Sequence, residues 1–210
     1  VTGVQTCALP ICINDEWLSR YRTLVEFGGV DKSTTRVKVR RHAAALAVGL
    51  AESGASMKMD DATADLAKLA KGSANIPEIP IPDGINATLR DYQHQGFSWM
   101  QFLAERGLGG VLADDMGLGK TLQSLAFVKH RAIDDDGVHL VVAPRSVVDN
   151  WYDECAKFVP DVPVYVHLGL DRTKKLGDLP RTGILLTSYN ILQRDIKLLQ
   201  QIEYASIILD

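Results

Sequence analysis

The stretch "LADDMGLGKT", residues 112–121, decides how this sequence folds. It overlaps a short apolar run at residues 109–114, which is typical of a strand, and the start of a helical pattern at residues 120–132. A strand, a glycine-rich turn and a helix that opens on Lys-Thr make up the order of a phosphate-binding loop. The glycines are needed because backbone N–H groups must point inward, which requires φ values that other residues avoid.

The residues of this loop match the chemistry of nucleotide binding. Lys120 can reach the β- and γ-phosphates, and Thr121 can place its hydroxyl on Mg²⁺. The start of the following helix adds free N–H groups and the positive end of its dipole. The pattern G-x-x-x-x-G-K-[ST] fails at its first position, where this chain has Asp114, and a dinucleotide fingerprint fails at Leu122, where it needs a third glycine. A glycine-rich turn beside an ordinary surface lysine is the alternative without function.

The rest of this region alternates between apolar strand patterns and helical patterns. Further strands are predicted at residues 138–144, 162–168, 183–188 and 205–210, and helices at residues 91–107, 120–132, 146–158 and 189–202. With residues 109–114, that makes about five strands separated mostly by helices. Such an order predicts an α/β fold, with a parallel sheet that helices flank on both faces.

Composition excludes several classes of protein. The 210 residues carry a net charge of −3, so bulk charge does not indicate nucleic-acid binding. The longest uncharged apolar run, residues 43–51, is too short to cross a bilayer, so no membrane partner is expected. The three cysteines, Cys7, Cys12 and Cys155, form no paired framework, which suits a reducing cytoplasm, and the five histidines show no metal-ligand spacing.

The part of the chain before residue 76 carries little information. Residues 1–11 resemble a translated sequencing adapter and are excluded from fold reasoning as an artefact. Residues 12–75 are interpreted as the tail of an upstream accessory module, with a strand near residues 36–41 and helices at residues 41–54 and 60–72.

A proline-rich segment, residues 76–88, is predicted to be a linker, because prolines exclude a helix and favour an extended chain. Residues 89–210 are then assigned to one nucleotide-binding lobe.

Several motifs resemble those of Swi/Snf-type ATPases, the chromatin-remodeller-like branch of helicase superfamily two. Residues 112–121 resemble motif I of that family, in which an acid commonly stands where this chain has Asp114. The other matches follow in the family's order: residues 89–100 resemble the Q motif, 141–160 motif Ia, 184–192 motif Ib and 207–210 the start of motif II. Residues 80–93 are most similar to bacterial members.

The resemblance implies a first RecA-like lobe that uses ATP and Mg²⁺. Gln93 is the expected adenine reader, although from its position alone it would be an ordinary helix-surface glutamine. The remaining residues expected to bind the cofactor are Asp115, Met116, Gly117, Leu118, Gly119, Lys120 and Thr121. Lys120 and Asp210 are the expected catalytic groups, and Thr121 and Asp210 the expected metal ligands, because acids at the carboxyl end of such a strand can hold Mg²⁺.

The resemblance also implies contacts with nucleic acid. Ser146 stands where motif Ia touches the DNA backbone, and Thr187, Ser188 and Tyr189 stand in motif Ib. Residue types alone allow simpler readings: Ser146 is a good helix N-cap with Asp149 three residues on, and the group at 187–189 could be a strand-end cap.

Two sets of residues are expected to pack in the core. Trp151 shares a helical face with Val147, Val148 and Cys155, and Cys155 is expected to be a small buried hydrophobe. Among the aromatic residues of the helix at 91–107, packing is favoured over base stacking for Tyr92, Phe97 and Trp99.

The function expected of the whole protein is ATP-dependent translocation on double-stranded DNA. The expected partners are duplex DNA, a second RecA-like lobe in cis and protein targets on DNA, in the bacterial cytoplasm on the nucleoid. The sequence ends at Asp210, where the family continues with glutamate, so an incomplete lobe is expected. The alternatives are a P-loop NTPase or kinase that does not act on nucleic acid, and an inert nucleotide-binding fragment.

Overall fold

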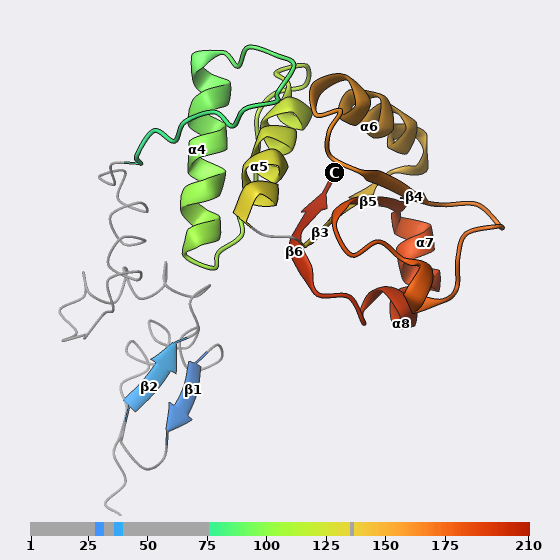
Figure 1. The fold of residues 1–210 in the computed structure, drawn as a ribbon. Helices are drawn as coiled ribbons and strands as arrows, with labels where there is room; N and C mark the ends of the chain where they lie inside the picture. Colours follow the sequence, from blue (N-terminus) through green and yellow to red (C-terminus); the bar gives the residue numbers. More distant parts are fainter. Residues whose placement is uncertain (1–27, 32–35, 40–75, 135–136) are drawn as a thin grey trace, which may run out of the picture. The chain divides into compact units, whose positions relative to one another are not determined.

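A computed structural model describes residues 28–31, 36–39, 76–134 and 137–210, and the chain divides into two compact units, 1–75 and 76–210 (Figure 1). In the first unit, strands β1 (Gly28–Asp31) and β2 (Arg36–Val39) pair antiparallel. Strand β2 lies within the strand expected near residues 36–41. The two helices expected between residues 41 and 72 lie outside the described residues.

The second unit is built on a four-stranded parallel sheet. Its strands are β3 (Val138–Ala143), β4 (Val164–His167), β5 (Gly183–Ser188) and β6 (Tyr204–Leu209). They run in the order β4-β5-β3-β6, and every neighbouring pair is parallel. The predicted α/β class with a parallel sheet is therefore confirmed.

Helices occupy most of the segments between these strands. They are α4 (Asp91–Glu105), α5 (Lys120–Asp134), α6 (Arg145–Phe158), α7 (Tyr189–Arg194) and α8 (Ile196–Leu199), with a short 3₁₀ turn, η2, at Leu176–Asp178. Figure 1 shows α4 and α5 lying side by side, with α6 beyond them. Helix α4 ends where Gly107 takes a φ of 66°, a left-handed conformation that stops helices without steric cost.

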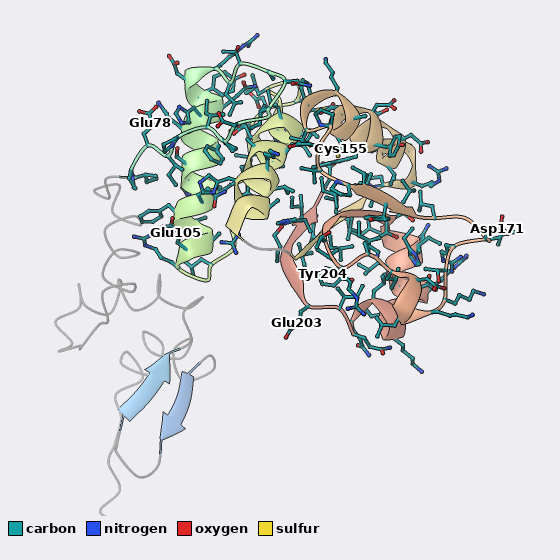
Figure 2. All side chains as sticks on the ribbon, in the orientation of Figure 1. Glu78, Glu105, Cys155, Asp171, Glu203 and Tyr204 are labelled. Atoms are coloured by element: carbon teal, nitrogen blue, oxygen red, sulfur yellow. The ribbon has the colours of Figure 1, made fainter. Side chains whose placement is uncertain are left out.

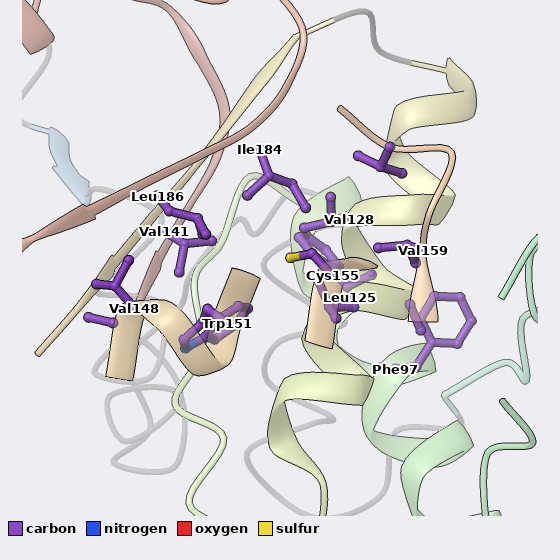
Figure 3. Packing of buried hydrophobic residues seen from close by; sticks show 14 of the residues in the cluster. Phe97, Leu125, Val128, Val141, Val148, Trp151, Cys155, Val159, Ile184 and Leu186 are labelled. Carbon is purple, nitrogen blue, oxygen red and sulfur yellow. The ribbon is translucent and has the colours of Figure 1, made fainter. Parts of the chain in front are cut away.

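Apolar side chains fill both faces of the sheet. On one face, alternate residues of β3 and β5 meet α5 and α6, as Figure 3 shows for Val141, Ile184, Leu186 and their neighbours. On the other face the remaining β3 and β5 positions pack with Leu199 of α8 and partly buried leucines of α7 and α8. Strands covered on both faces bury every residue, which explains their continuous apolar runs.

Two predicted elements are wrong in detail. Residues 109–114, expected to form the first strand, are irregular, and the side chain of Val111 is 84% exposed. An apolar pattern cannot form a strand by itself, because a strand needs a neighbour to share its backbone hydrogen bonds. The single helix expected at 189–202 is interrupted at Asp195, which ends α7 and precedes α8.

The proline-rich segment belongs to the second unit and packs against its helices. The Ile79 amide donates to the Ser98 hydroxyl at 3.1 Å, and the Asn86 amide donates to the Phe158 carbonyl at 2.9 Å. Leu89, just after the segment, is 7% exposed. Residues 76–90 therefore lie against α4 and α6 even though they have no regular structure.

Each helix within the described ranges is too short or too polar to traverse a lipid bilayer. The same ranges hold no group of three or more histidine, cysteine or acidic side chains arranged to hold a metal ion.

Candidate nucleotide-binding site

The loop between α4 and α5 has the backbone conformation that its glycines predict. Gly117 has a φ of 83° and Gly119 a φ of 73°, both in the left-handed region. A Cβ on Gly117 would meet no atom within 4 Å, so that position needs glycine for its conformation. A Cβ on Gly119 would lie 2.5 Å from Nε2 of Gln93, so a side chain there would also displace the end of the Gln93 side chain.

Lys120 directs its charge back into this loop. It is the first residue of α5, and its Nζ donates to the carbonyls of Asp114 at 2.8 Å and Asp115 at 2.9 Å. The ammonium group is therefore enclosed by the loop at the N-terminus of a helix. An anion held in the loop would meet both the lysine charge and the free N–H groups of the helix.

Gln93 and Tyr92 connect α4 to the loop through a single carbonyl. Gln93 Nε2 donates to the Leu118 carbonyl at 3.1 Å, and the Tyr92 hydroxyl donates to the same oxygen at 3.2 Å. The other amide atom of Gln93, Oε1, accepts from the Arg90 amide at 2.9 Å. The structure thus brings Gln93 to the loop, as the motif order implied, and shows a polar role for Tyr92, which had been expected only to pack.

Gln123 is a site residue that the sequence reasoning missed. It is fully buried on α5, and its Nε2 donates to the Asp114 carboxylate at 3.1 Å. Asp114 replaces the first glycine of the loop pattern, and this contact ties that acid to the helix that follows. The signal in the sequence was one polar residue on the apolar face of the predicted helix at 120–132.

Asp210 directly follows β6 at the carboxyl edge of the sheet. Its amide donates to the Val142 carbonyl at 2.9 Å, next to the end of β3. Its carboxylate Oδ2 accepts the indole N–H of Trp151 at 2.8 Å, and its main-chain oxygen accepts the Tyr189 hydroxyl at 2.7 Å. Sequence reasoning placed Trp151 in the core, where it is 4% exposed, but had no means to find its bond to Asp210.

The four residues expected to touch nucleic acid differ in exposure. Ser146 is exposed in the first turn of α6, and Tyr189 is 40% exposed at the start of α7. Thr187 is fully buried, with its hydroxyl donating to the His167 carbonyl at 2.9 Å, and Ser188 is 4% exposed. The structure therefore presents the side chains of Ser146 and Tyr189 at the surface and keeps those of Thr187 and Ser188 inside the fold.

The expected capping role of Ser146 is wrong. Helix α6 has Pro144 at its N-cap and no side-chain cap bond, which makes Ser146 the second residue of the helix. Asp149 pairs instead with Arg145, at 3.1 Å from Nη1 to Oδ2. Because Ser146 does not cap the helix, its exposed hydroxyl is available to a ligand.

Cys155 has the buried, unreactive character expected of it. The residue is fully buried on α6, and Figure 2 labels it among the side chains of that helix. Burial, with a smaller contribution from Glu154, raises the pKa of the Cys155 thiol to about 12. A thiol that stays protonated at neutral pH is a poor nucleophile, so no covalent chemistry is assigned to it.

The described contacts therefore fall into two groups. One joins α4, the glycine-rich loop and α5; the other joins α6, α7 and β3 to Asp210. Within residues 76–134 and 137–210, no hydrogen bond links Lys120 or Thr121 to Asp210.

Comparison with known families and proteins gives the following matches. A family described as "SNF2-related domain" matches residues 92–210, more than half of the chain. YwqA of Bacillus subtilis, named as an ATP-dependent helicase/translocase, is 39% identical over 145 residues, which cover 65% of this chain and 15% of YwqA. The human chromatin-remodeling ATPase INO80 is 34% identical over 147 residues, covering 63% of this chain and 9% of its own length.

Two solved structures from Sulfolobus solfataricus share the fold. The SWI2/SNF2 ATPase core in complex with double-stranded DNA is 38% identical with a TM-score of 0.56, covering 63% of this chain and 28% of that one. The second is a structure of the SWI2/SNF2 ATPase core domain. It is 39% identical with a TM-score of 0.58, and the match covers 66% of this chain and 28% of that one. The chain thus spans only a minor part of each of these proteins.

Proposed function

The chain belongs to the SNF2-related family, and from that premise we propose that the intact protein is an ATPase that translocates along double-stranded DNA. The observation that carries the proposal is the loop before α5, where two left-handed glycines precede a lysine whose ammonium turns back into the loop. A loop of this kind favours a phosphate chain, because N–H groups and a fixed cation converge on one point.

The residues present fit ATP with Mg²⁺. The left-handed backbone at Gly117 and Gly119 lets N–H groups turn into the loop, and Lys120, whose ammonium lies in the loop, supplies the charge that phosphate oxygens need. Thr121 and Asp210 carry the hard oxygen ligands that Mg²⁺ prefers, and we assign both to the metal. When bound, the metal would neutralise charge on the phosphates. The protein's own contribution is to position the groups that surround it.

Gln93 is assigned to the adenine base. Its amide already bridges the start of α4 and the Leu118 carbonyl, so it lies beside the loop that would hold the phosphates. An amide can both donate and accept, which matches the edge of adenine. The remaining cofactor contacts are assigned to the backbone of residues 115–119, since Met116 is 97% exposed and its side chain has no polar function.

Duplex DNA is the proposed track, and Ser146 and Tyr189 are its proposed contacts in this lobe. Both are exposed and both lie in the first turn of a helix that follows a sheet strand, where N–H groups can meet phosphates. The related Sulfolobus core was solved with double-stranded DNA, which supports this choice. Thr187 and Ser188 are buried, so they would contribute to DNA binding by holding Tyr189 in position.

We also propose a domain organisation for the intact protein. Residues 89–210 are assigned to a first RecA-like lobe, preceded by a linker at 76–88 and an upstream module, with a second lobe in cis closing over the nucleotide. The proposed protein partners are proteins bound to DNA, on which the ATPase would act. We also propose a cytoplasmic, nucleoid-associated location in a bacterium; the match to a Bacillus protein supports the bacterial origin.

The test measures phosphate release by the intact protein with and without linear duplex DNA. We expect ATP turnover that duplex stimulates more than single strands do, and displacement of a triplex-forming strand from the duplex. ATP turnover that no nucleic acid changes would favour the alternative of a P-loop NTPase or kinase without nucleic-acid action. No turnover at all would contradict the ATPase itself.

A further inference from the structure

Asp210 is bound at three separate atoms by three separate elements. Its amide bonds to Val142 of β3, its carboxylate Oδ2 to Trp151 of α6, and its main-chain oxygen to Tyr189 of α7. Within the described ranges, the other carboxylate oxygen, Oδ1, accepts no hydrogen bond. One face of the carboxylate is therefore held by the protein and the other remains for a ligand.

The bond from Trp151 is specific to its indole N–H. Trp151 is 4% exposed, packed in the cluster drawn in Figure 3, and its only polar group is a donor that needs an acceptor when buried. The acceptor is a carboxylate 59 residues away in the sequence, at 2.8 Å. Such a charge-assisted bond fixes the carboxylate's orientation as well as its position.

Both donors belong to helices that begin at the proposed nucleic-acid surface. Trp151 lies about 1.7 turns into α6, whose first turn carries Ser146, and Tyr189 is itself the first residue of α7. A displacement of either helix by a ligand at its start would move a donor that touches Asp210.

We propose that Trp151 and Tyr189 are positioning residues: they orient the Asp210 carboxylate for a divalent cation and tie it to the two helices that meet DNA. The inference rests on the proposed function and adds to it the device that connects the track to the metal. Groups that orient a metal ligand commonly change metal affinity by 10-fold or more when removed, which sets the size of the expected effect at about 10-fold.

The experiment measures Mn²⁺ binding by the intact protein in the presence of ADP, with free Mn²⁺ followed by electron paramagnetic resonance. Trp151→Phe keeps the packing of an aromatic ring and removes the N–H, and we expect about 10-fold weaker Mn²⁺ binding. The ADP affinity of this variant in the presence of a chelator should equal that of the wild type. Loss of folding would weaken the binding of both Mn²⁺ and ADP, so unchanged ADP affinity rules it out. Trp99→Phe, a partly buried tryptophan of α4, is the matched control and should match the wild type.

Tyr189→Phe is the second variant, and it keeps the proposal testable if the core variant does not fold. Tyr189 is 40% exposed, so removing its hydroxyl leaves the packing in place. We expect Mn²⁺ to bind roughly fivefold more weakly, the equivalent of one ordinary hydrogen bond. Wild-type affinity for Mn²⁺ in both variants would overturn the inference while leaving the proposed function intact. A wild-type protein that binds no ADP would overturn both.

The link to DNA has its own measurement. Saturating duplex DNA should change the Mn²⁺ affinity of the wild-type protein with ADP, and the double variant Trp151→Phe, Tyr189→Phe should bring that ratio closer to one. An unchanged ratio in the double variant, or a wild-type ratio of one, would overturn the coupling.

Discussion

Lys120 and Gly119 stand next to each other and serve the loop through different physical properties. Lys120 contributes its positive charge, and its ammonium donates hydrogen bonds to two loop carbonyls. Gly119 contributes a left-handed backbone and the absence of a Cβ. The two can therefore be separated by substitution.

Lys120→Ala in the intact protein should reduce ATP turnover by at least about 100-fold, the scale of losing one preorganised electrostatic contact. The free energy of unfolding should fall by roughly 1–3 kcal/mol, since two hydrogen bonds to loop carbonyls are lost. Phosphate release and denaturant titration measure the two effects. Lys129→Ala, on the same helix and paired with Asp161, is the control and should keep its turnover; near-normal turnover of Lys120→Ala would refute the loop assignment.

Gly119→Ala should weaken nucleotide binding about 10-fold, because a Cβ at a φ of 73° is strained by about 1–3 kcal/mol and would also press on Gln93. Titration with a fluorescent ADP analogue measures the change. Gly109→Ala is the matched control, because a Cβ there would meet nothing within 4 Å and no left-handed φ is required. Equal affinity in the two variants would show that the loop does not approach the ligand.

At the scale of elements, the pairing of β5 with β4 depends on a close backbone contact at the first residue of β5. Gly183 opens that strand with a φ of 87°, and the next amide, Ile184, donates to the Pro163 carbonyl at 2.8 Å. A Cβ on Gly183 would lie 2.4 Å from that same carbonyl oxygen. The close approach of two backbones sets the start of β5 beside β4.

Gly183→Ala should lower the free energy of unfolding by at least about 1–2 kcal/mol from its left-handed conformation, and further because backbone atoms must move apart. Urea titration of the chain measures this. Gly177→Ala, in the turn before the same strand, should change stability by less than about 0.5 kcal/mol, since a Cβ there has open space. Similar losses in the two variants would contradict the argument from close approach.

Asp195 explains why one predicted helix is two. Its carboxylate Oδ2 accepts from His167 Nε2 at 2.9 Å and from Arg172 Nε at 2.5 Å, so it turns inward where α7 ends. These contacts join the end of β4, the loop that carries Asp171 at its tip in Figure 2, and the junction of α7 and α8. A partly buried ionic contact thus lies at the point where the helical pattern of the local sequence is interrupted.

At the scale of the whole molecule, this ionic network makes stability depend on acid pH. The Arg172 guanidinium first, and His167 second, lower the pKa of Asp195 to about 2 from its ordinary 3.8. A carboxyl group with a lowered folded-state pKa stabilises the fold above its unfolded-state pKa. That contribution is lost as pH falls from about 4 through about 2.

Asp195→Asn should therefore destabilise the chain most at pH 5 and above, roughly, with the difference from the wild type shrinking as the pH approaches 2. Urea titrations at a series of pH values measure the difference. Asp171→Asn, an exposed residue of the same loop, should show little effect at any of these pH values. A constant difference for Asp195→Asn across the series would show that its charge is not what matters.

Much of this protein was determined by its sequence alone. Apolar periodicity predicted helices α4, α5 and α6 and the four strands of the sheet, because each periodicity expresses which face of a local element is buried. The sequence at residues 112–121 predicted glycines in a left-handed conformation, and the order of motifs indicated the SNF2-related family. All of these depend on residues that are neighbours in the chain.

The tertiary structure alone decided which distant groups meet. Sequence patterns did not reveal the bond of Trp151 to Asp210, the burial of Thr187 or the break at Asp195, and they predicted a strand at residues 109–114 that does not form. The physical reason is the same in each case. A polar side chain takes the partner that packing brings to it, and a strand forms only where another strand shares its hydrogen bonds, so both depend on segments far apart in the sequence.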